Sequence, residues 1–160
     1  LVIRPELIQQ GAWLFHENAH KWLERGNQQM PDADDTPPAP EALVRGYLAA
    51  MEARQLDRAA AMLGDGFTMT FPGTAPMHSL QQLIDWAAPR YRFVRKTYEG
   101  VDVTSAGGTA VVYCRGWLAG EWPDGTAFDT IRFVDRFEVS HGKIIKQDVW
   151  NDIAEMKAQP

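Results

Sequence analysis

The sequence predicts an α+β domain in which helices come first and an antiparallel sheet follows. Amphipathic stretches dominate up to about residue 88, and strand-like runs with period-two alternation fill residues 91–153. Short turn signals separate those runs, as in a meander. Helices and strands segregated in this way indicate an α+β fold, and 160 residues are enough for one such domain.

A separate helix is predicted ahead of this domain. Residues 5–25 carry apolar side chains at spacings of three and four, Pro5 suits a first helical turn, and Gly26 ends the pattern. We therefore predict an N-terminal helical extension over residues 1–29. Residues 30–40 are expected to form an acidic, proline-rich linker.

The domain itself is predicted to begin with helices. Residues 41–64 are amphipathic with a break near Gln55, which indicates two short helices, and residues 67–71 resemble a strand. Ser79 and Gln82 have capping-box spacing, so the next helix should begin there. Four strands are then expected, within residues 91–105, 109–122, 126–140 and 143–153, followed by a tail over residues 154–160.

Side-chain alternation places charged groups among apolar ones. Asp135 shares a strand face with Ile131, Phe133 and Phe137, so burial should disfavour its charged form. Arg115 shares a face with Tyr113 and Trp117 in the preceding strand, and an ion pair between Asp135 and Arg115 is the purely structural alternative. Because both sheet faces are apolar, we expect helices on one and a second subunit on the other.

Composition narrows the classes of partner. A net charge of −5 and a pI near 5.3 exclude a basic nucleic-acid-binding face, and no apolar run is long enough to span a membrane. The single Cys114 cannot form an internal disulfide, which fits a cytoplasmic protein. No cofactor motif is present, so we expect none.

The stretch "HENAH", His16 to His20, has the H-E-x-x-H spacing of zinc proteases. Two imidazoles one turn apart can bind zinc, and Glu17 could act as the base. No third histidine follows at ligand spacing and no sheet precedes the helix. We therefore predict a solvated helix face and no metal site.

Two segments, "YLAAMEARQLDRAAAMLGDGFTMTFPG" and "IRFVDRFEVSHGKIIKQDVWND", resemble the nuclear transport factor 2-like superfamily. This group includes SnoaL-like polyketide cyclases, ketosteroid isomerases and limonene epoxide hydrolases. The resemblance covers residues 41–153 and implies a cone-shaped fold with helices packed on a curved sheet. It also implies a SnoaL-like domain with a ligand pocket, although one fold hosts many reactions.

Two residues match ketosteroid isomerase. Tyr47 falls where that family has the tyrosine of its oxyanion hole, and Asp135 falls where it has a protonated aspartate. SnoaL-like cyclases also have an acid at the latter position. Phe71 replaces the isomerase base, which leaves the base open, with His78 and Asp148 as candidates.

The likeness to epoxide hydrolases is weaker. Arg115 and Asp148 resemble two members of their water-activating Asp-Arg-Asp triad, but Trp117 stands in place of the other aspartate. Hydrolysis through that triad is therefore not expected.

The resemblance implies a homodimer, formed through the outer sheet face, that binds an apolar small molecule carrying a carbonyl or hydroxyl oxygen. The expected reaction is cofactor-independent isomerisation or cyclisation through an enolate-like intermediate. A noncatalytic ligand-binding or dimerisation module is the alternative. The candidate catalytic residues are Tyr47 and Asp135. The candidate substrate-binding residues are Trp86, Tyr91, Tyr113, Arg115, Trp117, Phe133 and Asp148.

Overall fold

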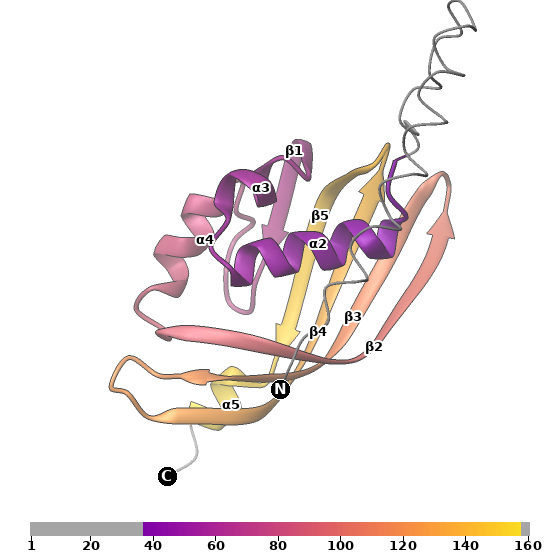
Figure 1. The fold of residues 1–160 in the computed structure, drawn as a ribbon. Helices are drawn as coiled ribbons and strands as arrows, with labels where there is room; N and C mark the ends of the chain where they lie inside the picture. Colours follow the sequence, from indigo (N-terminus) through magenta and orange to yellow (C-terminus); the bar gives the residue numbers. More distant parts are fainter. Residues whose placement is uncertain (1–36, 158–160) are drawn as a thin grey trace, which may run out of the picture. The chain divides into compact units, whose positions relative to one another are not determined.

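The computed structural model describes residues 37–157 (Figure 1). In chain order the elements are α2 (Pro40–Glu52), α3 (Leu56–Ala60), β1 (Leu63–Thr70), α4 (Leu80–Ala87), β2 (Phe93–Ala106), β3 (Thr109–Glu121), β4 (Ala127–Ser140), β5 (Lys143–Asn151) and α5 (Ile153–Lys157). The predicted α+β order is confirmed. The predicted helix over residues 5–25 and the "HENAH" spacing lie outside the described residues.

The five strands form one sheet in the order β1-β5-β4-β3-β2. The last four strands run antiparallel to their neighbours, as the turn signals predicted. β1 differs, because it pairs parallel with β5 and makes the sheet mixed. β1 and β2 are the two edge strands of the sheet. The segment between them contains α4, and it carries the chain from the β1 edge to the β2 edge before the antiparallel strands begin.

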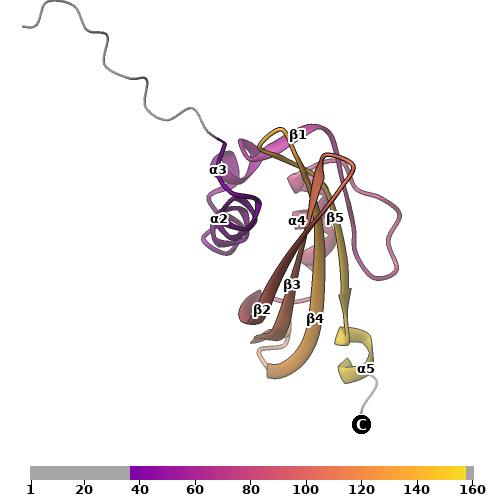
Figure 2. The same ribbon diagram turned by 90° about the vertical axis from the view of Figure 1, so that its right-hand side faces the viewer.

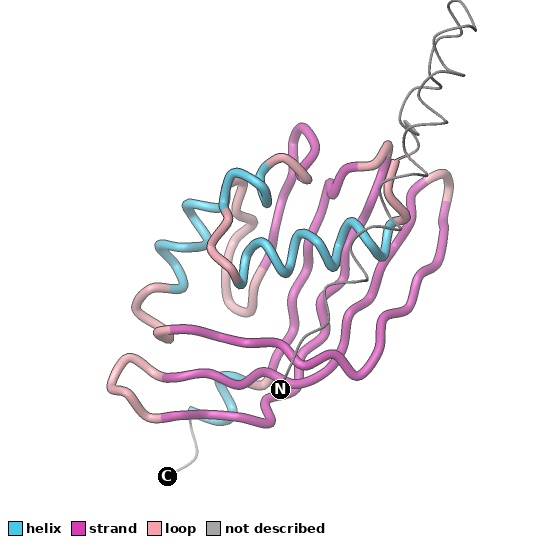
Figure 3. Tube along the Cα trace, in the orientation of Figure 1, coloured by secondary structure: helices cyan, strands magenta, loops and turns pink. Residues whose placement is uncertain are grey.

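The sheet is curved by irregularities in its long strands. The pairing register shifts between Tyr98 and Gly100 and again between Leu118 and Gly120, and β2, β3 and β4 change direction along their length (Figure 3). Gly116 lets β2 and β3 approach closely there. A Cβ atom on Gly116 would lie 2.0 Å from the Thr97 carbonyl oxygen.

Helix α2 covers the inner face of the sheet (Figure 2). Its buried side chains include Val44, Tyr47 and Leu48, whose spacing of three and four residues points them toward the strands. They pack in the same core as Cys114 and Phe137 of the sheet. The capping prediction for α4 is confirmed, because the Ser79 hydroxyl accepts a hydrogen bond from the Gln82 backbone N–H at 3.2 Å.

The opposite, outer face of the sheet exposes large apolar side chains. Tyr113, Trp117, Val134 and Trp150 are 38%, 41%, 37% and 54% exposed. Val134 and Trp150 are direct cross-strand partners. We call these four residues the outer apolar patch. Within the part of the chain that the structure describes, no helix is long and apolar enough to cross a membrane.

Candidate functional site

A cavity of about 170 Å³ lies between the helices and the inner face of the sheet. Helices α2 and α4 and strands β2 to β5 all contribute side chains to it. Most of the lining is apolar, including Leu48, Met51, Leu83, Leu118 and Val149. A concave, largely apolar site with a few convergent polar groups is the usual form of a small-molecule pocket.

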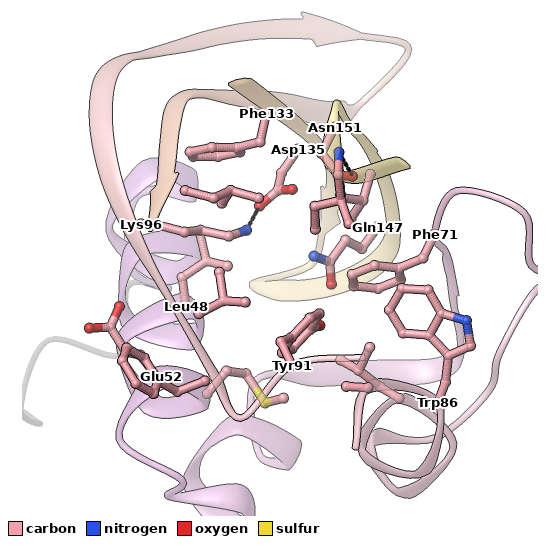
Figure 4. A pocket seen from close by; sticks show the side chains of 18 of the residues that line it. Leu48, Glu52, Phe71, Trp86, Tyr91, Lys96, Phe133, Asp135, Gln147 and Asn151 are labelled. Carbon is pink, nitrogen blue, oxygen red and sulfur yellow. Dashed lines mark hydrogen bonds and ion pairs between the residues drawn. The ribbon is translucent and has the colours of Figure 1, made fainter. Parts of the chain in front are cut away.

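Several polar groups of the lining gather around Asp135, at what we call the polar end of the cavity, whereas Glu52 lies apart from them (Figure 4). Lys96 of β2 donates a hydrogen bond to Oδ2 of Asp135 on β4, and the two side chains point toward each other (Figure 4). The Lys96 Nζ also lies 4.7 Å from the centre of the Phe133 ring. Asp135 is completely buried, whereas the Lys96 side chain is 20% exposed.

The second carboxyl oxygen of Asp135 is unusual. Oδ1 is buried and has no hydrogen-bond partner among the described residues. A buried acceptor without a donor costs about 1–3 kcal/mol. A ligand that supplies an O–H group to Oδ1 would remove that cost.

Tyr47 completes the polar end from α2. Its hydroxyl donates to Oε1 of Gln147 at 3.3 Å, and both side chains are buried. The hydroxyl is therefore anchored to β5 while its residue lines the cavity. We call Tyr47, Lys96, Asp135 and Gln147 the polar cluster.

Burial controls the ionisation of this cluster. Desolvation raises the pKa of the Asp135 carboxyl, and the neighbouring Lys96 ammonium partly offsets the increase. Desolvation also raises the pKa of the Tyr47 hydroxyl, and the nearby Asp135 charge adds to the effect. Tyr47 therefore remains a proton donor at neutral pH.

Aromatic residues form the other side of the cavity. The rings of Phe71 and Trp86 lie 5.1 Å apart, and the Arg90 guanidinium lies 4.1 Å from the centre of the Trp86 ring. Figure 4 shows Phe71, Trp86 and Tyr91 on the side away from Asp135. A flat apolar ligand would find stacking surfaces there.

Five of the predicted site residues line this cavity: Tyr47, Trp86, Tyr91, Phe133 and Asp135. The structure places the other four elsewhere. Tyr113, Arg115 and Trp117 alternate with the buried Cys114 and Leu118 and so project from the outer face. Asp148 pairs with Arg136 at 3.4 Å and Lys146 at 3.2 Å, away from the cavity lining.

The buried ion pair has a different partner from the one considered in the sequence. Arg115 pairs with Asp102 on the outer face, so it does not balance Asp135. Lys96 takes that place because Val94, Lys96 and Tyr98 alternate onto the inner face, opposite Gly120, Leu118 and Gly116. This alternation is visible in the sequence of β2, where it groups Lys96 with the apolar side chains of Val94 and Tyr98, although it does not say which face of the sheet they share.

Neither candidate base lies in the cavity. His78 is exposed and does not line it, and Asp148 lies on the outer face. Glu52 and Asp135 are the carboxyl groups in the lining, and of these only Asp135 is buried. Among residues 37–157, no group of three or more histidine, cysteine, aspartate or glutamate side chains could hold a metal ion.

The helix-covered, curved sheet with a cavity on its inner face defines a nuclear transport factor 2-like domain. Residues 44–147 match the model of the SnoaL-like domain, so the chain belongs to that family. No curated protein matches the chain.

Solved structures share the fold. A nuclear transport factor 2-like protein of unknown function from Burkholderia pseudomallei is 18% identical with a TM-score of 0.58, over 72% of this chain and 92% of that one. TerC, crystallised with polyporic acid, is 12% identical with a TM-score of 0.60, over 73% and 94%. A protein from Jannaschia assigned as a SnoaL-like polyketide cyclase is 19% identical with a TM-score of 0.54, over 80% and 100%. At these identities the likeness shows the fold alone.

Proposed function

We propose that the cavity binds a mainly apolar small molecule through one carbonyl or hydroxyl oxygen, which lies against Tyr47 and Asp135. We further propose that it supports a cofactor-independent isomerisation or cyclisation through an enolate-like intermediate. The observation that carries the proposal is Oδ1 of Asp135, which is buried in a mainly apolar cavity and has no hydrogen-bond partner among residues 37–157. TerC, crystallised with polyporic acid, gives a ligand-containing example of the same fold.

The chemistry follows from the positions of the two groups. An oxygen that gains negative charge in the reaction is stabilised by preorganised donors in a site that excludes water. The Tyr47 hydroxyl would be one such donor once its single proton turns from Gln147 to the ligand oxygen. Asp135 would be the other, after its carboxylate has taken up the proton that the ligand releases. Aromatic side chains along the remaining wall would hold the ligand's apolar body.

The first test is the affinity of a series of substituted naphthols that differ in hydroxyl acidity. We expect affinity to rise with acidity and to fall about tenfold or more in Tyr47→Phe and in Asp135→Asn, since each removes a buried hydrogen-bonding group. Tyr113→Phe and Asp102→Asn make the same chemical changes on the outer face and should leave affinity unchanged. Absence of binding, or binding indifferent to Tyr47 and Asp135, would overturn the proposal.

The second test separates catalysis from binding. Deuterium exchange at the carbon next to the carbonyl of an apolar ketone such as 2-tetralone reports enolate formation directly. We expect the wild type to accelerate this exchange and Asp135→Asn to lose the acceleration. Naphthol binding without accelerated exchange would instead establish the noncatalytic binding module.

We also propose that two copies of the chain associate through the outer apolar patch. Exposed apolar groups on a sheet face commonly mark such an interface. Charged pairs on this face would give the contact polar partners, among them Asp102 with Arg115, Arg132 with Asp152, and Arg136 with Glu138.

A further inference from the structure

Lys96 brings a positive charge to the polar end of the cavity. Its ammonium lies between the Asp135 carboxyl and the face of the Phe133 ring, and its side chain is 20% exposed. A buried ion pair is weak evidence of a stabilising role, because desolvating two charges offsets much of their attraction. Oδ1 of Asp135 also has no hydrogen-bond partner among the described residues, so the pair keeps an acceptor that a ligand hydroxyl could use.

We infer that Lys96 enables the cavity to hold an acidic ligand hydroxyl as its anion, with the ligand's proton transferred to Asp135. This inference rests on the proposed function and specifies its ligand class. The ligands are apolar compounds with a phenolic or enolic hydroxyl, and ketones that react through an enolate.

The proton balance explains why a cation is needed. Before binding, the Lys96 ammonium donates to Oδ2 of an ionised Asp135, so the pair is neutral overall. When the ligand binds, its O–H bond breaks and an O–H bond forms at Oδ1 of Asp135. Lys96 keeps its own protons and donates to the ligand oxygen, so one cation and one anion are present before and after.

Removing Lys96 would break this balance. The ligand anion would then be a lone charge in an apolar cavity, which is strongly disfavoured. Burial also favours the proton transfer, because it raises the pKa of Asp135 and so makes this carboxyl a better proton acceptor. Tyr47 cannot replace the cation, since its neutral hydroxyl supplies a hydrogen bond without charge.

The test is the absorption spectrum of 2-naphthol bound at neutral pH, where the free compound is neutral and its anion absorbs at longer wavelength. We expect the naphtholate band with the wild type and with Lys96→Arg, which keeps the charge. Lys96→Met and Lys96→Gln should bind only neutral naphthol. Their affinity for the most acidic naphthols should fall about tenfold or more, because a hydrogen bond to a charged group is lost.

Two comparisons keep the result interpretable. The Lys96→Gln side chain can still donate a hydrogen bond to Asp135, so this variant tests the charge even if Lys96→Met fails to fold. Lys146→Met removes an exposed lysine on β5, and its bound naphthol should give the same spectrum as the wild type. A naphtholate band in Lys96→Gln, or neutral naphthol bound to the wild type, would overturn the inference while leaving the proposed function intact. No naphthol binding at all would overturn both.

Discussion

Lys96 and Asp135 form an ion pair on the inner face of the sheet although 39 residues separate them in the chain. They lie on β2 and β4, with β3 between them, so the contact exists only because three strands pair in register. The β2–β3 pairing has a register shift between Tyr98 and Gly100, and both Lys96 of β2 and Asp135 of β4 line the same cavity. The site is thus a product of sheet shape more than of local sequence.

The stability of the protein should depend on pH through Asp135. Its folded-state pKa is raised by burial above the ordinary value of 3.8, so the unfolded chain releases this proton first as pH rises. Asp135 therefore contributes stability that is present below pH 3.8 and is lost as pH rises through the folded-state pKa, by up to about 1.4 kcal/mol per pH unit. Asp135→Asn cannot titrate, so its free energy of unfolding should increase relative to that of the wild type as the pH rises.

Urea unfolding of the wild type and of Asp135→Asn, at a series of pH values from below 3.8 to neutral, measures the difference in their free energies of unfolding. Asp148→Asn, on the outer face, is the matched control. A difference between wild type and Asp135→Asn that grows in favour of the wild type with rising pH would show that Lys96 outweighs the effect of burial.

Close approach of β2 and β3 should make Gly116 irreplaceable. A Cβ atom there would meet backbone atoms of Thr97 and Glu99 at 2.0 Å and 2.9 Å, and backbone cannot move aside as a side chain can. We expect Gly116→Ala to lower the free energy of unfolding by about 3 kcal/mol or more, as overpacking does. Thermal unfolding followed by circular dichroism is sufficient to detect this loss.

Gly46→Ala provides the opposite expectation from the same chemical change. Gly46 lies in α2, and an added Cβ atom would meet only the end of the Met62 side chain, at 3.4 Å. Alanine should therefore stabilise the helix by about 0.5–1 kcal/mol. Equal effects at Gly46 and Gly116 would contradict the close approach of β2 and β3 at Gly116.

The outer apolar patch should determine oligomeric state. Replacing Trp117 or Trp150 with glutamate would bury a carboxylate in an apolar contact, and the symmetry of a dimer would do so twice, which should convert a dimer to monomers. Sedimentation equilibrium measures this directly. Val103→Glu makes a similar change on the inner side of β2, opposite Val112, and should leave the dimer intact. A monomeric wild type would overturn the dimer proposal.

Sequence patterns predicted the elements well because each pattern is local. The break near Gln55, the Ser79 cap and all four long strands depend on neighbouring residues, and the structure confirms them. Burial of Asp135 followed from alternation within one strand. The parallel pairing of β1 with β5 could not be predicted in this way, because it joins segments that no local turn connects.

The site was harder to predict. The alternation of side chains along a strand shows which residues share a face, but it does not show which face the helices cover. Tyr113, Arg115 and Trp117 share a face as predicted, but both faces of β3 are rich in apolar residues, and the helices lie on the other one. Lys96 was missed for a related reason. Its partner depends on register across β3, which the sequence of β2 does not contain.

A strained threonine provides the last prediction. Thr130 has φ of +56° in β4, a region that β-branched residues rarely occupy. It lies at the bulge where Leu118 pairs with Ile131 but Gly120 pairs with Phe128, so two residues of β4 face one of β3. This bulge bends the strand, and Thr130 adopts the left-handed conformation that the bend requires.

Thr130→Gly should therefore stabilise the protein. The left-handed conformation costs a non-glycine residue about 1–2 kcal/mol, while glycine's extra freedom in the unfolded chain costs about 0.5–1 kcal/mol. The net gain should be about 0.5–1 kcal/mol, measured as an increased urea midpoint with an unchanged m-value. Thr97→Gly is the matched control, because Thr97 is an exposed strand threonine without positive φ, and it should lose about 1 kcal/mol. If Thr130→Gly lost as much as Thr97→Gly, the bend in β4 would not depend on a strained residue.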